Sequence, residues 1–228
     1  MSETPASLEL TYRSDAALLV AYATHLTRGQ LPVQTTARLP TGTPLHLRLV
    51  APAASISLTG IVSGISGSTE IPEVALSVTS RAEALHEAVD RLAFGFKGLK
   101  ALVAASQAAP RALLIRYLRS IVTCEMIEID QTKLAEPGAI CNVDLAVIDL
   151  DSTGAAGYEL YARLREHPEA GNAPVLACAQ LERDRARAAS LGFDEALANP
   201  PAFGDLQTAA LRSLAKPIGL TLTEAAGR

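Results

Sequence analysis

The sequence contains few aromatic residues and no long apolar run. Aromatic residues make up 4% of the 228 residues and tryptophan is absent, while hydrophobic residues together reach 49%. The hydrophobic cores should therefore be built from aliphatic and small side chains. A membrane-spanning helix needs about 18 or more consecutive apolar residues, and no such run occurs. The N-terminal residues also lack the basic and apolar regions of a signal peptide, so we expect a soluble, cytoplasmic protein.

Patterns for metal ions, disulfides and nucleic acids are also missing. Cys124, Cys141 and Cys178 have no CxxC spacing and lie in apolar, strand-like runs, which indicates buried thiols rather than metal ligands or disulfide partners. The four histidines are scattered singly and form no zinc pattern. The net charge of −4, without a basic stripe in either half, disfavours DNA binding. We expect neither a cofactor nor a metal.

A chain of this length fits two compact domains, and the first is predicted to span residues 1–98. In its first part, apolar and polar residues alternate in several short runs separated by turn formers, as in 39–44 and 63–72. This period of two indicates half-buried antiparallel strands in an all-β barrel or sandwich. From Ala82 to Phe96 the apolar spacing changes to three and four, which predicts a helix after the strands.

The segment LTRGQLPVQTTARLPTGTPLHLRL (26–49) lies within this strand-rich region. It resembles the PilZ domain, in particular the divergent variety of gliding and social bacteria, and the resemblance covers roughly residues 7–97. It implies a six-stranded Greek-key barrel followed by a helix.

PilZ domains that bind cyclic di-GMP use an RxxxR arm, whose guanidiniums hold the phosphates, and a [DN]xSxxG loop that fixes the base. In this chain the arm offers one arginine, His25 replaces the acid or amide, and Gln30 replaces the final glycine. These losses make cyclic di-GMP an unlikely ligand and favour an interaction module. The degenerate nucleotide site would comprise Arg13, His25, Thr27, Arg28 and Gly29.

The second domain is predicted to span residues 99–217, followed by a tail over 218–228 that folds back or docks on a partner. Continuous apolar runs alternate with helical patterns, which indicates a doubly wound, flavodoxin-like fold with a five-stranded parallel sheet. Functional groups of such folds lie at the carboxyl ends of the strands. The predicted strands are 101–105, 124–129, 144–150, 174–179 and 195–198, and the predicted helices are 108–120, 157–167, 181–191 and 204–215, with a short helical turn near 131–136.

Two segments of this domain, DLAVIDLDSTGAAGYEL (144–160) and GFDEALANPPAFGDL (192–206), align without gaps to a known pattern. They resemble the receiver domain of two-component response regulators, over about residues 100–216. The resemblance places the phosphoacceptor at Asp149 and the loop glycine at Gly157. It also implies an acidic pair that holds Mg²⁺, a hydroxyl and a lysine that bind the phosphoryl group, and a rotating aromatic side chain.

Most of these parts are replaced here. Ala105 and Ser106 occupy the acidic pair, Cys178 the hydroxyl position, Asn199 the lysine position and Ala196 the aromatic position. The sequence therefore predicts a pseudo-receiver in which Asp149 is a vestigial phosphoacceptor, without enzyme activity.

The function we expect is that of a non-catalytic signalling adaptor that acts by protein–protein interaction. The resemblances imply bacterial motility, type IV pili, polarity or extracellular matrix as its setting, with signalling or motility proteins as partners and residues 181–215 as the contact surface. A homodimer is left open, and insertion into a membrane is not expected. One alternative is a cyclic di-GMP effector, and another is a phosphorylation-responsive regulator that uses Asp149, with Asp151 as a second carboxylate.

Overall fold

The computed structural model describes residues 6–37, 39–67, 72–79, 82–130, 140 and 142–223, with only the backbone described at 72 and 82–84. The predicted helical turn near 131–136 and Cys141 lie outside these ranges. The chain forms two compact units, one of Met1–Phe96 with Ala215–Arg228 and the other of Lys97–Leu214. The second unit is thus inserted into the first. No helix within the described ranges is long and apolar enough to cross a membrane.

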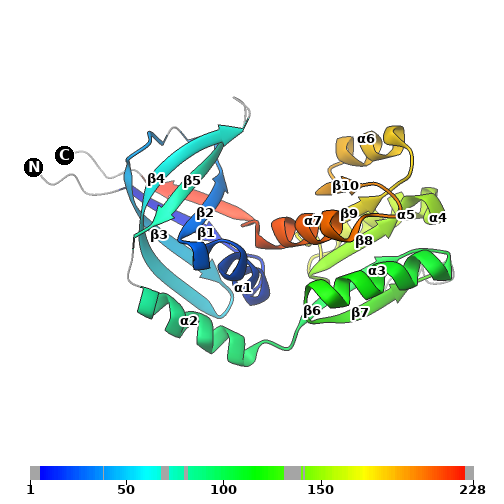
Figure 1. Cartoon of the computed structure of the whole chain (residues 1–228), viewed down its shortest axis with the longest axis horizontal. Coiled ribbons are helices and arrows are strands. Elements are labelled where there is room, and N and C mark those ends of the chain that lie inside the picture. Colours follow the sequence, from blue (N-terminus) through cyan, green and yellow to red (C-terminus); the bar gives the residue numbers. More distant parts are fainter. Residues whose placement is uncertain are drawn as a thin grey trace, which may run out of the picture. The chain divides into compact units, whose positions relative to one another are not determined.

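The first unit is organised around a six-stranded sheet in the order β11-β1-β3-β4-β5-β2 (Figure 1). Strand β1 runs parallel to β3, and every other neighbouring pair is antiparallel. The elements are β1 (Ala6–Thr11), α1 (Asp15–Thr24), the 3-10 turn η1 (Leu26–Arg28), β2 (Gln30–Gln34), β3 (Pro44–Ala51), β4 (Ala54–Gly67), β5 (Pro72–Val78), α2 (Ala82–Gly95) and β11 (Gly219–Thr223).

This arrangement corrects three expectations for the first domain. The sheet is mixed rather than purely antiparallel, and helix α1 interrupts the predicted all-β order between β1 and β2. In the part of the chain described, β11 and β2 stand at opposite ends of the strand order, so the sheet is not closed into the predicted barrel. Ser14 caps α1, because its hydroxyl accepts a hydrogen bond from the Ala17 N–H at 3.2 Å.

The core of the first unit lies on one face of this sheet. Alternate strand residues such as Leu10, Leu47 and Leu76 are buried there, and Leu18 of α1 and Val89 of α2 belong to the same cluster. Figure 1 shows α1 and α2 beside the sheet. The apolar residues of the alternating pattern are therefore those through which the sheet contacts these two helices.

Residues 219–223 belong to the sheet rather than to a free tail. Strand β11 pairs with β1 and places Leu220 opposite Leu10 and Leu222 opposite Leu8. Both β11 leucines are partly buried against the core of the first unit. The C-terminal segment therefore folds back, and the strand that completes the first unit follows the second unit in the chain.

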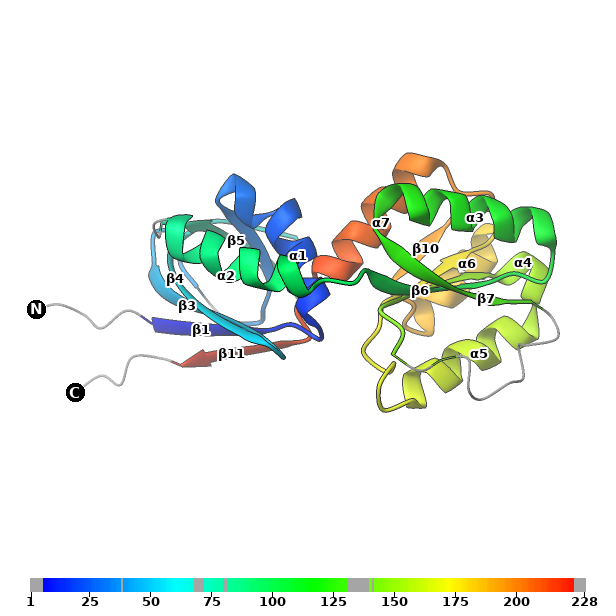
Figure 2. The ribbon, with the colours of Figure 1, turned by 90° about the horizontal axis from the view of Figure 1, so that it is seen from below.

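The second unit has a parallel five-stranded sheet in the order β10-β9-β8-β6-β7, as predicted. This is a doubly wound order: from β6 the chain first adds β7 on one side of the sheet and then β8, β9 and β10 on the other, so the strand order reverses between β6 and β8. Figure 2 shows α3 and α7 on one face of the sheet and α5 on the other. The elements are β6 (Leu99–Ala104), α3 (Ala108–Ile121), β7 (Cys124–Ile129), β8 (Leu145–Asp149), α4 (Leu150–Thr153), α5 (Ala155–Glu166), β9 (Val175–Cys178), α6 (Glu182–Ser190), β10 (Glu195–Leu197) and α7 (Phe203–Ala215).

If β11 is an integral strand, its core-facing leucines stabilise the first unit. We expect the Leu220→Ala and Leu222→Ala changes to cost about 1–2 kcal/mol each, because each removes partly buried apolar surface. Exposed Thr221→Ala and Thr223→Ala are the matched controls and should stay within about 0.5 kcal/mol. Denaturant unfolding measures the free energy of unfolding of each variant. In the leucine variants, amide hydrogen exchange should be faster in β1 and unchanged in β6 and β8. Equal effects of the leucine and threonine changes would contradict the role of β11.

Candidate functional site

Asp149 lies at the carboxyl end of β8, beside the point where the strand order reverses. All five residues of β8 are buried, and Asp149 itself is 1% exposed. Its Oδ1 accepts hydrogen bonds from the backbone N–H groups of Asp151 (3.1 Å) and Ser152 (3.3 Å). The side chain thus caps α4, a use that short acidic side chains commonly have at helix starts.

Asn199, which the receiver resemblance places at the lysine position, joins two carboxylates. Its Nδ2 donates to Asp149 Oδ1 at 2.7 Å and to Asp151 Oδ2 at 2.8 Å. Asp151 is exposed but engaged, because its carboxylate also accepts from the Gln180 N–H at 2.9 and 3.1 Å. One neutral amide therefore binds both acids, and through Asp151 and the Gln180 N–H the same network joins the segments that follow β8, β9 and β10.

Arg111 of α3 binds the backbone at Ala105, one of the two positions that the receiver resemblance gives to the acidic pair. Ala105 is buried, and its carbonyl accepts a hydrogen bond from the Arg111 guanidinium at 2.8 Å. Arg111 also forms an ion pair with Glu128 at 3.6 Å. The neighbouring Ser106 N–H donates to Ser152 Oγ at 3.1 Å. The positive guanidinium repels a divalent cation, whereas two carboxylates at these positions would attract one.

The residues present do not fit Mg²⁺. This ion requires near-octahedral oxygen coordination that includes one or two carboxylates. Here Asp149 and Asp151 are already bound to Asn199 and to backbone N–H groups. Within the described ranges, no group of three or more His, Cys, Asp or Glu side chains is placed to hold a metal ion.

Cys178 ends β9 and faces the same two acids. It is fully buried, and burial together with the charges of Asp149 and Asp151 raises the pKa of its thiol to about 12. A thiol with so high a pKa is protonated at neutral pH and is a poor nucleophile. The second carboxylate oxygen of Asp149, Oδ2, is also buried and accepts no hydrogen bond from the described part of the chain. All the hydrogen bonds of this carboxylate are thus on its Oδ1 atom.

Gly157 lies in the first turns of α5, where the packing leaves no room for a side chain. A Cβ atom at this position would lie 2.3 Å from Thr153 Oγ1 and 3.1 Å from Ile148 Cγ2. The glycine that marks the loop in the sequence is therefore explained by close contact between α5 and the end of β8.

The predicted nucleotide-binding residues are distributed around α1. His25, Thr27, Arg28 and Gly29 follow the helix in the η1 turn, where Gly29 adopts a φ of 66°. The Thr27 hydroxyl donates to the Ala23 carbonyl at 3.1 Å. The hydroxyl expected to read a base therefore supports the local backbone.

Arg13 precedes α1, whereas the loop from His25 follows it. A helix of ten residues is about 15 Å long, so the structure places Arg13 at the opposite end of α1 from Thr27 and Arg28. Burial and the Arg28 charge lower the pKa of His25, against the opposing effect of Glu73. The structure brings His25, Thr27, Arg28 and Gly29 together but does not bring Arg13 to them.

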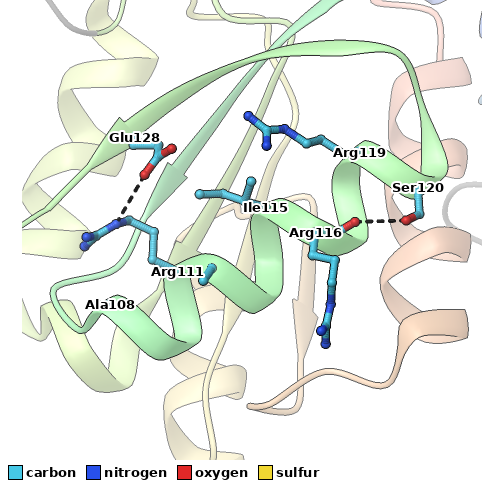
Figure 3. A pocket seen from close by; sticks show the side chains of 8 residues that line it. Ala108, Arg111, Ile115, Arg116, Arg119, Ser120 and Glu128 are labelled. Atoms are coloured by element: carbon cyan, nitrogen blue, oxygen red, sulfur yellow. Dashed lines mark hydrogen bonds and ion pairs between the residues drawn. The ribbon is translucent and has the colours of Figure 1, made fainter.

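No pattern in the sequence indicated a groove between α3 and β7. Figure 3 shows it, with Ile115 between Arg111 and Arg119 on the helix and Glu128 on the strand. Its volume is about 600 Å³. A second groove, of about 300 Å³, lies between α6 and β10 and includes Ala186, Ala189 and Ala196. The second groove falls within the predicted contact surface 181–215.

Comparison with known proteins finds structural similarity over half the chain. No family model and no curated relative matches this sequence. A receiver domain of a sensor histidine kinase from Pseudomonas aeruginosa, with a magnesium ion in its active-site cleft, is 19% identical, with a TM-score of 0.46 over 52% of this chain and 99% of its own. A response regulator from Desulfuromonas acetoxidans is 20% identical (TM-score 0.44; 51% and 96% covered). A receiver domain of a DNA-binding response regulator from Colwellia psychrerythraea is 18% identical, with a TM-score of 0.43 over 50% of this chain and 96% of its own.

Removal of the bridging amide should destabilise the second unit. Asn199→Ala leaves Asp149 and Asp151 near each other without their shared donor, and we expect a loss of about 1.5–3 kcal/mol, the range for hydrogen bonds to charged groups. Gln180→Ala is the matched control, because Gln180 uses its backbone N–H and keeps it after the change. Urea unfolding at neutral pH provides the measurement. If Asn199→Ala is as stable as Gln180→Ala, the bridge contributes nothing to folding.

Proposed function

We propose that the chain is a non-catalytic adaptor in a bacterial signalling pathway and that it acts through protein–protein contacts. The observation that carries this proposal is the Asn199 amide bound to both Asp149 and Asp151. In a phosphorylated receiver the acceptor carboxylate must be free to attack and must face a metal ion. Here its Oδ1 accepts hydrogen bonds from three donors, and the Arg111 guanidinium is bound to the carbonyl of Ala105, where the receiver resemblance places a metal-binding acid.

The same contacts argue against phosphoryl transfer at Asp149. A lysine would bind the phosphoryl oxygens with a positive charge, whereas Asn199 offers a neutral amide whose hydrogen bonds are already used. Cys178 supplies a protonated thiol in place of the hydroxyl. The proposal therefore includes the absence of enzyme activity, with Asp149 retained as a structural cap.

The α6–β10 surface is the contact site that we propose on the second unit. Its groove is bordered by the small, exposed side chains of Ala186 and Ala189, which allow close approach of a partner helix. Leu181 and Leu191, at the two ends of α6, are 47% and 48% exposed. Apolar residues around a groove with a polar rim are typical of protein interaction sites.

The cellular setting that we propose is motility, type IV pili, polarity or extracellular matrix, with the protein in the cytoplasm. Support for this setting is the resemblance of the sequence to PilZ and receiver domains, which is an argument from analogy. The separation of Arg13 from Thr27 and Arg28 by α1 disfavours the cyclic di-GMP alternative.

The adaptor proposal predicts that phosphodonors do not modify the protein. Incubation with acetyl phosphate and Mg²⁺ should leave the intact mass unchanged, because Asp149 lacks a metal site and a lysine. A variant that restores the family residues, with Ala105→Asp, Ser106→Asp, Cys178→Thr and Asn199→Lys, serves as the positive control. A mass increase in the wild type that disappears in Asp149→Asn would instead support the phosphorylation-responsive alternative.

The proposed contact surface can be tested by one substitution made at two places. Ala189→Arg places a bulky charge at the α6–β10 groove and should reduce partner recovery in affinity purification from native lysate at least tenfold. Such a loss corresponds to about 1.4 kcal/mol of binding free energy. Ala112→Arg, an equally exposed position on α3, is the control and should retain the partner. Equal recovery with both variants would exclude the α6 surface.

A further inference from the structure

Strand β11 differs from the other strands that end the two sheets. The described strand orders leave β11 and β2 at the ends of one sheet and β10 and β7 at the ends of the other. Strand β2 carries Pro32 at its centre, β7 carries Glu125 and Glu128, and β10 is three residues long and begins with Glu195. Proline, charge and shortness are the usual protections of a sheet edge against pairing. Strand β11, with the sequence GLTLT, has no proline and no charge.

The backbone groups on the outer side of β11 follow from the hydrogen bonds of β1. The Tyr12 N–H donates to the Val50 carbonyl at 2.7 Å, which directs the even-numbered residues of β1 to β3 and the odd-numbered ones to β11. Thr221 is paired with Glu9 and therefore faces β1 with its N–H and C=O groups. The N–H and C=O groups of Leu220 and Leu222 consequently face away from the sheet.

We propose that β11 pairs with β11 of a second copy of this chain, antiparallel and about a two-fold axis at Thr221. In this register each Leu220 lies opposite Leu222 of the other copy, and each such pair exchanges two backbone hydrogen bonds. The sequence Leu-Thr-Leu reads the same in both directions, so in this two-fold register leucine meets leucine and threonine meets threonine. A second copy therefore offers this edge a strand without proline or charge and with the same apolar face.

The side chains agree with the same register. Leu220 and Leu222 lie on the core face of the sheet and Thr221 on the exposed face, so pairing continues the apolar face of one copy into that of the other. Like charges opposite each other destabilise strand pairs, and β11 contributes none. Glu9 of β1, which is paired with Thr221, is bound by Arg48 at 3.1 Å.

Charge substitutions at Thr221 test the pairing through its two-fold symmetry. Thr221→Lys and Thr221→Glu each place two like charges face to face across the axis, whereas an equal mixture of the two variants places opposite charges there. We expect a dimer for the wild type, monomers for each variant alone and a dimer for the mixture, as measured by sedimentation equilibrium. Ser57→Glu, on the exposed side of β4, is the control and should remain dimeric.

Hydrogen exchange distinguishes this interface from a dimer formed elsewhere. The outward Leu220 and Leu222 amides should be protected in the wild type and in the mixture, and should exchange at least tenfold faster in Thr221→Lys. A wild type that is monomeric at its highest attainable concentration overturns the proposal. A Thr221→Lys protein that stays dimeric, or a mixture that stays monomeric although both variants are folded by circular dichroism, overturns it as well.

Discussion

The second unit depends on one hydrogen-bonded constraint, the Asn199 amide held between Asp149 and Asp151. Two carboxylates that lie close together, here at the end of β8 and in the α4 turn that follows it, repel each other unless a cation or shared donors compensate them. Here the neutral Asn199 amide and backbone N–H groups donate the hydrogen bonds that compensate the two charges. Because Asp151 also receives the Gln180 N–H, the same network joins the loops that follow β8, β9 and β10. The carboxyl end of β8 is thereby held by internal hydrogen bonds to the segments that follow β9 and β10.

The Asn199 amide and the Arg111 guanidinium bind different groups at these strand ends. Ala105 and Ser106 carry no carboxylate, and the Arg111 guanidinium donates to the Ala105 carbonyl and forms an ion pair with Glu128. The Asn199 amide donates to both Asp149 and Asp151, which also accept from backbone N–H groups. The two acids are thus held by hydrogen bonds from neutral donors. This is why we look for function at the α6–β10 surface.

The sequence predicted the second unit well because its signals are local. Its strands are continuous apolar runs and its helices are amphipathic, so element type follows from nearby residues. The position of Asp149 followed from the ungapped motif, but the Asn199 and Arg111 contacts did not, since they depend on side chains that meet across the fold. Helix α1 was missed because DAALLVAYAT is apolar nearly all round and shows no helical face. Strand β11 was missed because five residues carry a weak signal and their partner, β1, lies at the other end of the chain.

The pairing of β1 with β11 also determines how the first unit can fold. Contacts between distant segments require a loop to close, and the entropic cost of closure grows slowly with loop length. Between β1 and β11 lies the whole second unit, so its prior folding shortens the flexible chain that must close. The local pairs β3–β4 and β4–β5 can form first, and β11 can join β1 only after the second unit has been synthesised. The sheet of the first unit is therefore completed last, by the uncharged strand that stands at its edge.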